Sequence, residues 1–314
     1  MMQRMPIIVL ANSDSRGGHV PDGLRRDLML EGPKGLLELP NGKCLAQELV
    51  SRLRESDRFD GIYLAGPQRL YSGRVDCEIV DVEGHLGQTL SRIETFISER
   101  LDPQAAVAFS ACDILPSSQE FRRLIDDHYS PHAGSVFWWQ LIGTPPEQMN
   151  ASSWKPAYHL SPCAGGTPAN LYPGHVVIVR PQSLRWKLTS RILHLAYHYR
   201  NRPLTSRYPG FVLRVLGSLF AQDIRNLLAL QFPVLTFGIP VDGLVKLIKH
   251  QTGRMTVADC ESFLRRALVH REFRHVANER PVAVSVVPIV SFARDIDTVT
   301  EFEEVTKGLA CDSD

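Results

Sequence analysis

The residues best suited to chemistry stand next to short apolar segments of the chain. Asp113 comes just after the apolar run 105–111, and Asp295 and Asp297 come just before the last helical pattern. Carboxylate oxygens are preferred ligands of Mg²⁺, and alternate positions of an extended segment face the same way. Lys34 stands just ahead of Leu36 and Leu37, two leucines that we expect to be buried, and it could bind phosphate groups. Each residue alone also fits a plainer role: a helix cap, an Asx-turn or a solvated lysine.

The loop after the first apolar segment, 6–11, is a further candidate. Small residues there, Ser13 and Ser15 among them, would let backbone N–H groups approach a phosphate, and Arg16 could pair with it. The loop matches neither the G-x-G-x-x-G pattern nor the P-loop pattern. A flexible surface loop is therefore the competing interpretation.

The elements that must position these residues alternate between apolar runs and helical patterns. A parallel, doubly wound sheet is the fold that this rhythm predicts. Ligands bind beyond the carboxyl ends of the strands in such sheets, so the loop and the three aspartates should meet at one edge. The expected strands are 6–11, 60–65, 77–82 and 105–111, and the expected helices are 45–53, 86–101 and 117–128.

The second half of the chain is less regular. Segment 143–173 is rich in Pro, Gly and Ser and predicts loop and hairpin. The remaining expected strands are 135–142, 175–179 and 282–290, and the expected helices are 183–200, 211–232, 241–250, 256–268 and 300–309. We expect one domain over 1–314, an α/β Rossmann-like, doubly wound, mostly parallel sheet, with a helical insertion or subdomain at 183–275.

Composition limits the possible partners. The chain has 314 residues and a formal net charge of +1, so bulk attraction to nucleic acid or to an acidic membrane surface is not expected. The six cysteines show no zinc-motif spacing, which fits a reducing cytoplasm. No apolar run is long enough for a signal peptide or a transmembrane helix, and we expect a cytoplasmic protein.

The sequence resembles the molybdenum-cofactor guanylyltransferase-like (MobA-like) branch of the nucleotidyltransferases. The resemblance rests on four motifs in order: Leu10 to Arg16, Pro33-Lys34-Gly35-Leu36-Leu37 through Leu45, Ala111 to Pro116, and Asp295-Ile296-Asp297-Thr298 to Phe302. Ser13 and Ser15 stand where the family has glycines. The segment Gly84 to Leu90 matches the part of the family that faces the nucleotide base, and Pro173-Gly174-His175 matches the part that faces the second substrate.

The resemblance implies a GT-A-like fold, an NTP donor and Mg²⁺. Lys34, Arg16 and Asp113 would be catalytic, and Asp113, Asp295 and Asp297 would hold the metal. The expected nucleotide-binding residues are Ala11, Asn12, Ser13, Asp14, Ser15, Gly84 and Gly87. The implied reaction moves a nucleoside monophosphate from the NTP to a small phosphorylated acceptor and releases pyrophosphate.

Two other functions stay open. A GT-A-like glycosyltransferase using a nucleotide-sugar needs the same metal carboxylate, and a catalytically degenerate nucleotide-binding protein would fit the serines of the first loop. Apolar stripes in 183–275 usually mean core. We expect these helices to flank the cleft and shape the acceptor pocket, with Gly174, His175 and Lys155 at its mouth. A contact with a membrane surface, or a homodimer formed through this segment, is the alternative.

Overall fold

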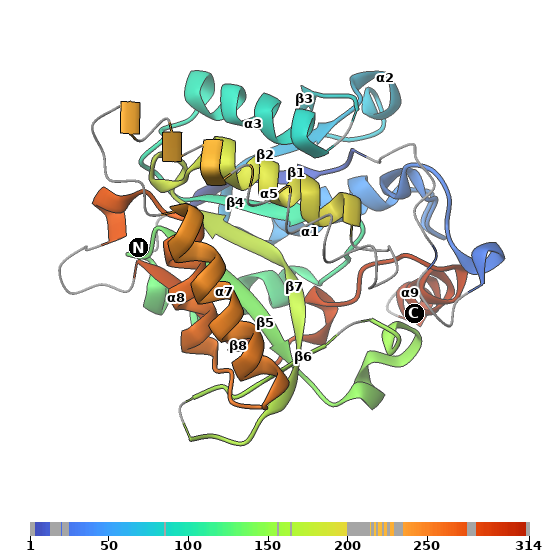
Figure 1. Ribbon diagram of the computed structural model, residues 1–314. Coiled ribbons are helices and arrows are strands. Elements are labelled where there is room, and N and C mark those ends of the chain that lie inside the picture. The colour runs from blue at the N-terminus through green and yellow to red at the C-terminus, as the bar shows by residue number, and fades with distance from the viewer. Residues whose placement is uncertain are drawn as a thin grey trace.

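The computed structural model describes residues 4–12, 20, 25–84, 86–155, 157–163, 165–199, 235–274 and 281–311, and part of 214–228. A mixed sheet crosses the centre of the molecule with helices packed on it (Figure 1), which confirms the α/β fold expected from the sequence. Its strands are β1 Met5–Leu10, β2 Phe59–Gly66, β3 Glu78–Asp81, β4 Val107–Ala111, β5 Phe137–Gly143, β6 Tyr158–Leu160, β7 Ala169–Val179 and β8 Val282–Val287.

The strand order is β3-β2-β1-β4-β7-β5-β8, with β6 paired to β7. The first four strands are parallel, β7 runs antiparallel to both of its long neighbours, and β8 pairs with β5 in parallel. The reversal at β7 brings its middle beside the end of β4. Residues from both halves of the chain thereby reach one edge of the sheet.

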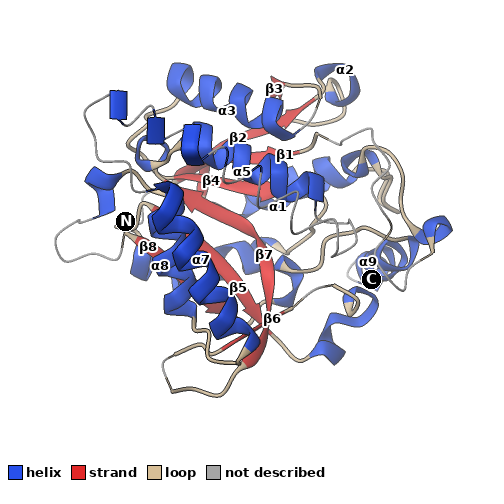
Figure 2. Ribbon diagram, viewed as in Figure 1, coloured by secondary structure: helices blue, strands red, loops and turns tan. Residues whose placement is uncertain are grey.

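Helices cover both faces of the sheet (Figure 2). Alternate residues of β1 face opposite ways: Ile7 packs in the cluster with α1 and α4, and Ile8 packs in the cluster with α3. These side chains are fully buried, which explains why the parallel strands read as unbroken apolar runs. The helices are α1 Leu45–Ser56, α2 Gln68–Tyr71, α3 Leu86–Arg100, α4 Ser118–Arg123, α5 Trp186–Tyr199, α7 Leu235–Gln251, α8 Val257–Leu268 and α9 Val299–Cys311.

The strand β7 is longer than the sequence indicated. It begins at Ala169, within the stretch expected to be loop and hairpin, and its first residues pair with β6 and β5. Pro173 and Gly174 made this part look like a loop. Gly174 is needed because a Cβ there would lie 2.3 Å from the side chain of Gln140, which crosses the strand at that point.

The described helices α5 and α8 of segment 183–275 pack on the α3 side of the sheet. Trp186 at the start of α5 packs against the apolar cluster that contains Ile8 of β1, and its ring meets Phe109 edge to face. The helix α8 lies over β8 through Val257 and Leu264. Gln182 donates to the carbonyl of Pro103, just past the end of α3, so α5 runs antiparallel to α3. Within the described residues, no helix combines the length and the apolar character needed to cross a bilayer.

Candidate active site at the carboxyl edge of the sheet

The carboxyl ends of β1 and β4 lie side by side and define the site. Leu10 pairs with Ala111, and the N–H of Cys112 donates to the carbonyl of Leu10 at 3.2 Å, so Asp113 emerges at this edge. The N–H of Ile296 donates to the carbonyl of Asp113 at 2.8 Å. This bond holds the segment that carries Asp295 and Asp297 against the end of β4.

Lys34 lies against two of these carboxylates, Asp113 and Asp297. Its Nζ lies 3.0 Å from Oδ2 of Asp113 and also contacts Asp297. The lysine begins a short 3-10 turn, Lys34–Leu36, and the N–H of Leu30 donates to the carbonyl of Asp297 at 2.9 Å. The loop ahead of Lys34 is therefore tied to the Asp297 segment by backbone as well as by charge.

Close packing beneath Lys34 requires glycine at position 35. A Cβ on Gly35 would lie 2.7 Å from the hydroxyl of Tyr71, which is fully buried and donates to the carbonyl of Ala11 at 3.0 Å. The Lys34 turn thus approaches the first loop as closely as the backbone permits. A larger residue at position 35 would push Lys34 away from the carboxylates.

Three carboxylates form a group that could hold a metal ion. Oxygen atoms of Asp113, Asp295 and Asp297 all lie within 4.8 Å of one another. An all-oxygen donor set suits Mg²⁺ or a similar hard cation, which completes its coordination with water or phosphate oxygens. The expected metal ligands therefore lie together at this edge.

A buried lysine and a histidine also face this group. Lys155, only 8% exposed, contacts Asp295 and lies 3.1 Å from Oε1 of Glu301 and 3.7 Å from Oδ2 of Asp297. Nε2 of His175 lies 3.3 Å from Oδ1 of Asp295. Both were expected at the mouth of an acceptor pocket, and an acceptor role for them stays a prediction. In this structure both side chains turn toward the carboxylates.

The pKa values of Asp295 and Asp297 are shifted in opposite directions. Burial alone would raise the pKa of Asp295, but His175 and Lys155 hold that pKa well below its ordinary value. Burial and the neighbouring charge of Asp295 raise the pKa of Asp297, and Lys34 and Lys155 only partly offset this. Burial lowers the pKa of His175, but Asp295 outweighs it and the net shift is upward. Asp295 is thus the firmly ionised member of the pair.

Glu301 fixes the backbone that carries Asp297. Its carboxylate accepts hydrogen bonds from the N–H groups of Asp297 and Thr298, both at 2.8 Å, and from the hydroxyl of Ser152 at 2.7 Å. The side chain is buried, and it satisfies donors at the start of α9 that would otherwise lack partners. Sequence reasoning missed this role, although Thr298 followed three residues later by Glu301 is a capping-box spacing.

Replacing Glu301 with glutamine is therefore expected to destabilise the protein by about 1–3 kcal/mol, because a neutral amide accepts these bonds more weakly and leaves Lys155 with less counter-charge. Activity should fall as well, since Asp297 loses its fixed position. Thermal melting and steady-state kinetics would measure both, with Glu303→Gln, an exposed change on the same helix, as the control. Unchanged melting of the Glu301 variant would contradict this positioning role.

The expected nucleotide-facing residues are partly brought together. Nδ2 of Asn12 donates to the carbonyl of Gly84 at 2.8 Å and to Oγ1 of Thr89 at 2.7 Å, which ties the loop after β1 to the start of α3. Gly84 has φ of +104°, a conformation that favours glycine. Ser13, Asp14, Ser15 and Arg16 lie outside the described residues.

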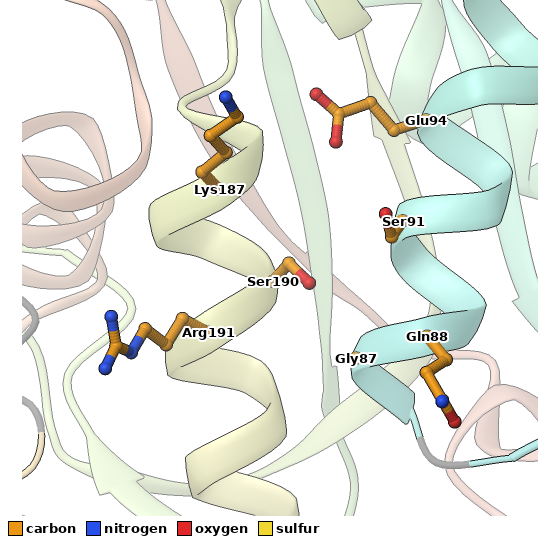
Figure 3. A pocket seen from close by; sticks show the side chains of 7 residues that line it. All are labelled: Gly87, Gln88, Ser91, Glu94, Lys187, Ser190 and Arg191. Atoms are coloured by element: carbon orange, nitrogen blue, oxygen red, sulfur yellow. The ribbon is translucent and has the colours of Figure 1, made fainter.

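Gly87 lies in the first turn of α3 and lines a groove between α3 and α5. Figure 3 shows Ser91 of α3 facing Ser190 of α5 across this groove, with Lys187 and Glu94 at one end. Because α5 runs antiparallel to α3, its later turns point toward the edge where Asn12 and Gly84 lie. The expectation that the helical segment flanks the site stays a prediction.

No family model and no curated protein matches the chain. Among solved structures it is similar to a CMP:2-keto-3-deoxy-manno-octonic acid synthetase complexed with CTP, with a TM-score of 0.46 and 9% identity over 99% of this chain and 100% of that one. A homolog of Mycobacterium tuberculosis Rv0371c from Mycobacterium sp. strain JC1 gives 0.43 at 12% identity over 98% of both chains. The bifunctional IspDF of Campylobacter jejuni gives 0.37 at 14% identity, over 61% of this chain and 43% of that one. These TM-scores lie below 0.5, and the function proposed below rests on site geometry and motifs.

Proposed function

We propose that the protein is a Mg²⁺-dependent nucleotidyltransferase that moves a nucleoside monophosphate from an NTP to a small phosphorylated acceptor. The single observation that carries this proposal is the placement of Lys34 between Asp113 and Asp297, at the edge where the loop after β1 begins. A lysine that binds phosphates and carboxylates that hold Mg²⁺ are recurring parts of phosphoryl-transfer sites. The order of the motifs along the chain supports the same function.

In the proposed reaction an oxygen of the acceptor attacks the α-phosphorus in line. The new P–O bond forms as the bond from the α-phosphorus to the bridging oxygen of the β-phosphate breaks, and pyrophosphate leaves with that oxygen. Asp113, Asp295 and Asp297 would hold Mg²⁺, which neutralises phosphate charge when bound. Positioning and electrostatics account for the catalysis, and no general base is needed to deprotonate a phosphate oxygen.

Lys34 has a defined part in this scheme. In this structure its ammonium group is held by two carboxylates, at the edge where triphosphate oxygens would lie. It is charged throughout the physiological range: burial opposes the charge, but Asp113 and Asp297 raise its pKa above the ordinary value. A permanently charged, carboxylate-oriented lysine can bind phosphate oxygens with little rearrangement.

The test is a screen of the four common NTPs against phosphorylated small molecules, with pyrophosphate release measured in the presence of Mg²⁺. We expect release that requires both an NTP and an acceptor and that EDTA abolishes. A matched screen of nucleotide-sugars distinguishes the glycosyltransferase alternative, which releases a nucleoside diphosphate instead. Nucleotide binding without turnover in either screen would indicate a degenerate binding protein and contradict the proposal.

A further inference from the structure

The helix α7 is oriented with its charged side toward the protein and its apolar side toward solvent. Lys246 and Lys249 each place Nζ 2.7 Å from Oδ1 of Asp259 on α8. Asp242 lies one turn before Lys246 and approaches Arg266 of α8 at 4.0 Å. Ion pairs therefore hold the interface between α7 and α8 beside the apolar contact of Ile239 with Ala267.

The opposite side of α7 carries an exposed apolar stripe. Its members follow the i, i+3, i+4, i+7 spacing of one helix face. They are Val241 at 62% exposure, Leu244 at 59%, Val245 at 45% and Ile248 at 52%. In a surface helix of a soluble domain this face normally points to the core, so the arrangement needs a partner.

A neighbouring helical stretch repeats the pattern. Leu219 is buried with Leu188, Ile239 and Ala267, which anchors this stretch to α5, α7 and α8. Four large apolar side chains among the described residues of this stretch face outward at helical spacing: Phe220, Ile224, Leu227 and Leu228, with exposures from 45% to 81%. Two helical stretches of one segment thus present apolar side chains to solvent.

Basic residues are concentrated in segment 183–275 and acidic residues in the rest of the chain, which favours an anionic partner for this segment. Residues 183–275 contain 15 Lys and Arg against 5 Asp and Glu, a formal charge of +10, whereas the rest of the chain contains 20 and 29, a charge of −9. Two of the five acids, Asp242 and Asp259, are already paired within the helices. Exposed basic residues include Lys187, Arg191, Arg254, Arg265 and Arg271.

We propose that this helical segment docks on an anionic lipid bilayer, with the α7 stripe inserted among the headgroups and exposed basic side chains of the segment on the lipid phosphates. Apolar burial and attraction to anionic lipid together drive interfacial helices onto membranes. A symmetric dimer through the same face is disfavoured, because it would bring two segments of +10 together. The inference does not depend on the reaction at the carboxylate site.

The test is co-sedimentation of the full chain with vesicles. We expect binding to vesicles of phosphatidylcholine with phosphatidylglycerol, little binding to phosphatidylcholine alone, and release from the anionic vesicles at high salt. The double variant L244Q/I248Q should bind the anionic vesicles at least about ten-fold more weakly, because two apolar side chains no longer enter the lipid. The conservative variant L244I/I248L should bind as the wild type does.

Folding and charge have their own controls. Both double variants should keep the wild-type melting temperature, since the changed side chains are exposed, and R254Q/R265Q should weaken binding and reduce its salt dependence. The proposal is overturned if the wild type ignores anionic vesicles or if L244Q/I248Q binds them normally. A vesicle-independent dimer, seen by sedimentation velocity and lost in L244Q/I248Q, would assign the stripe to a second copy and overturn it as well.

Discussion

Changing Lys34 to alanine is expected to lower kcat/KM for the nucleotide by roughly two to three orders of magnitude, the range for removing a preorganised charged donor. The loss should fall on triphosphate binding and on turnover alike, because Lys34 stands between Asp113 and Asp297. Pyrophosphate-release kinetics and titration with a non-hydrolysable NTP analogue measure the two effects. Lys34→Arg should restore little, since a forked guanidinium does not replace a compact ammonium here.

A matched control comes from the same motif. Lys43 is nearly half exposed and lies 3.4 Å from Glu48, away from the carboxylate cluster. Lys43→Ala should leave kcat/KM within about two-fold, as for most exposed ion pairs. Equal losses in the Lys34 and Lys43 variants would show that the effect comes from the fold of the segment and not from the site.

The geometry also predicts a change of stability that the sequence did not suggest. Without Lys34, Asp113 and Asp297 lose their common counter-ion and repel each other in a partly buried place. Melting of Lys34→Ala without metal should fall below that of the wild type, and Mg²⁺ should recover much of the difference. A melting temperature that stays at the wild-type value without metal would contradict the carboxylate cluster as described.

Changing Asp113 to asparagine is expected to reduce turnover by on the order of a thousand-fold. An amide oxygen is a neutral and weaker metal ligand, and a bound metal stabilises the charge of the transition state by several kcal/mol. Isothermal titration should show weaker Mg²⁺ binding, and higher Mg²⁺ should recover only part of the rate. Asp126→Asn is the control, since Asp126 pairs with Arg58 at 2.6 Å outside the site. Normal Mg²⁺ affinity in the Asp113 variant would remove that residue from the metal site.

The first half of the fold could be predicted because its strands are buried on both faces. Segments 6–11, 60–65, 77–82 and 105–111 were expected from apolar runs, and β1 to β4 lie within two residues of those bounds. The helix 86–101 was readable from one apolar face, and α3 spans Leu86–Arg100. In this region local pattern and tertiary environment agree.

In the second half of the chain, tertiary contacts determine the bounds and orientation of some elements, and local sequence patterns did not predict them. The strand β7 contains Pro173 and Gly174, which locally favour a loop, yet pairing with β5 and β6 extends the strand through them. Apolar stripes in 183–275 usually mean core, yet the stripe on α7 faces solvent, and the lysines of the opposite side pair with Asp259. Periodicity shows that a helix has an apolar face but not which way that face points.

Some residues of the site could be predicted from the sequence and others could not. Lys34, Asp113, Asp295 and Asp297 could be proposed from their places after or before apolar segments, and they lie together. The contacts of Lys155 with these carboxylates could not be predicted from the sequence. Lys155 lies in an irregular stretch whose position depends on the packing of residues distant in sequence. Its three carboxylate partners lie at least 140 positions further along the chain.

The contact between Lys34 and Asp297 joins positions 263 residues apart, and the backbone bond from Leu30 to Asp297 spans a similar separation. During synthesis the strands β1 to β4 can pair while the ribosome is still translating later codons, but the constellation at their edge must wait for the closing segment. Because loop-closure entropy rises with sequence separation, we expect this edge to form later than the pairing of β1 to β4. A chain cut short before Asp295 would therefore carry Lys34 and Asp113 without the two aspartates that complete this acidic edge.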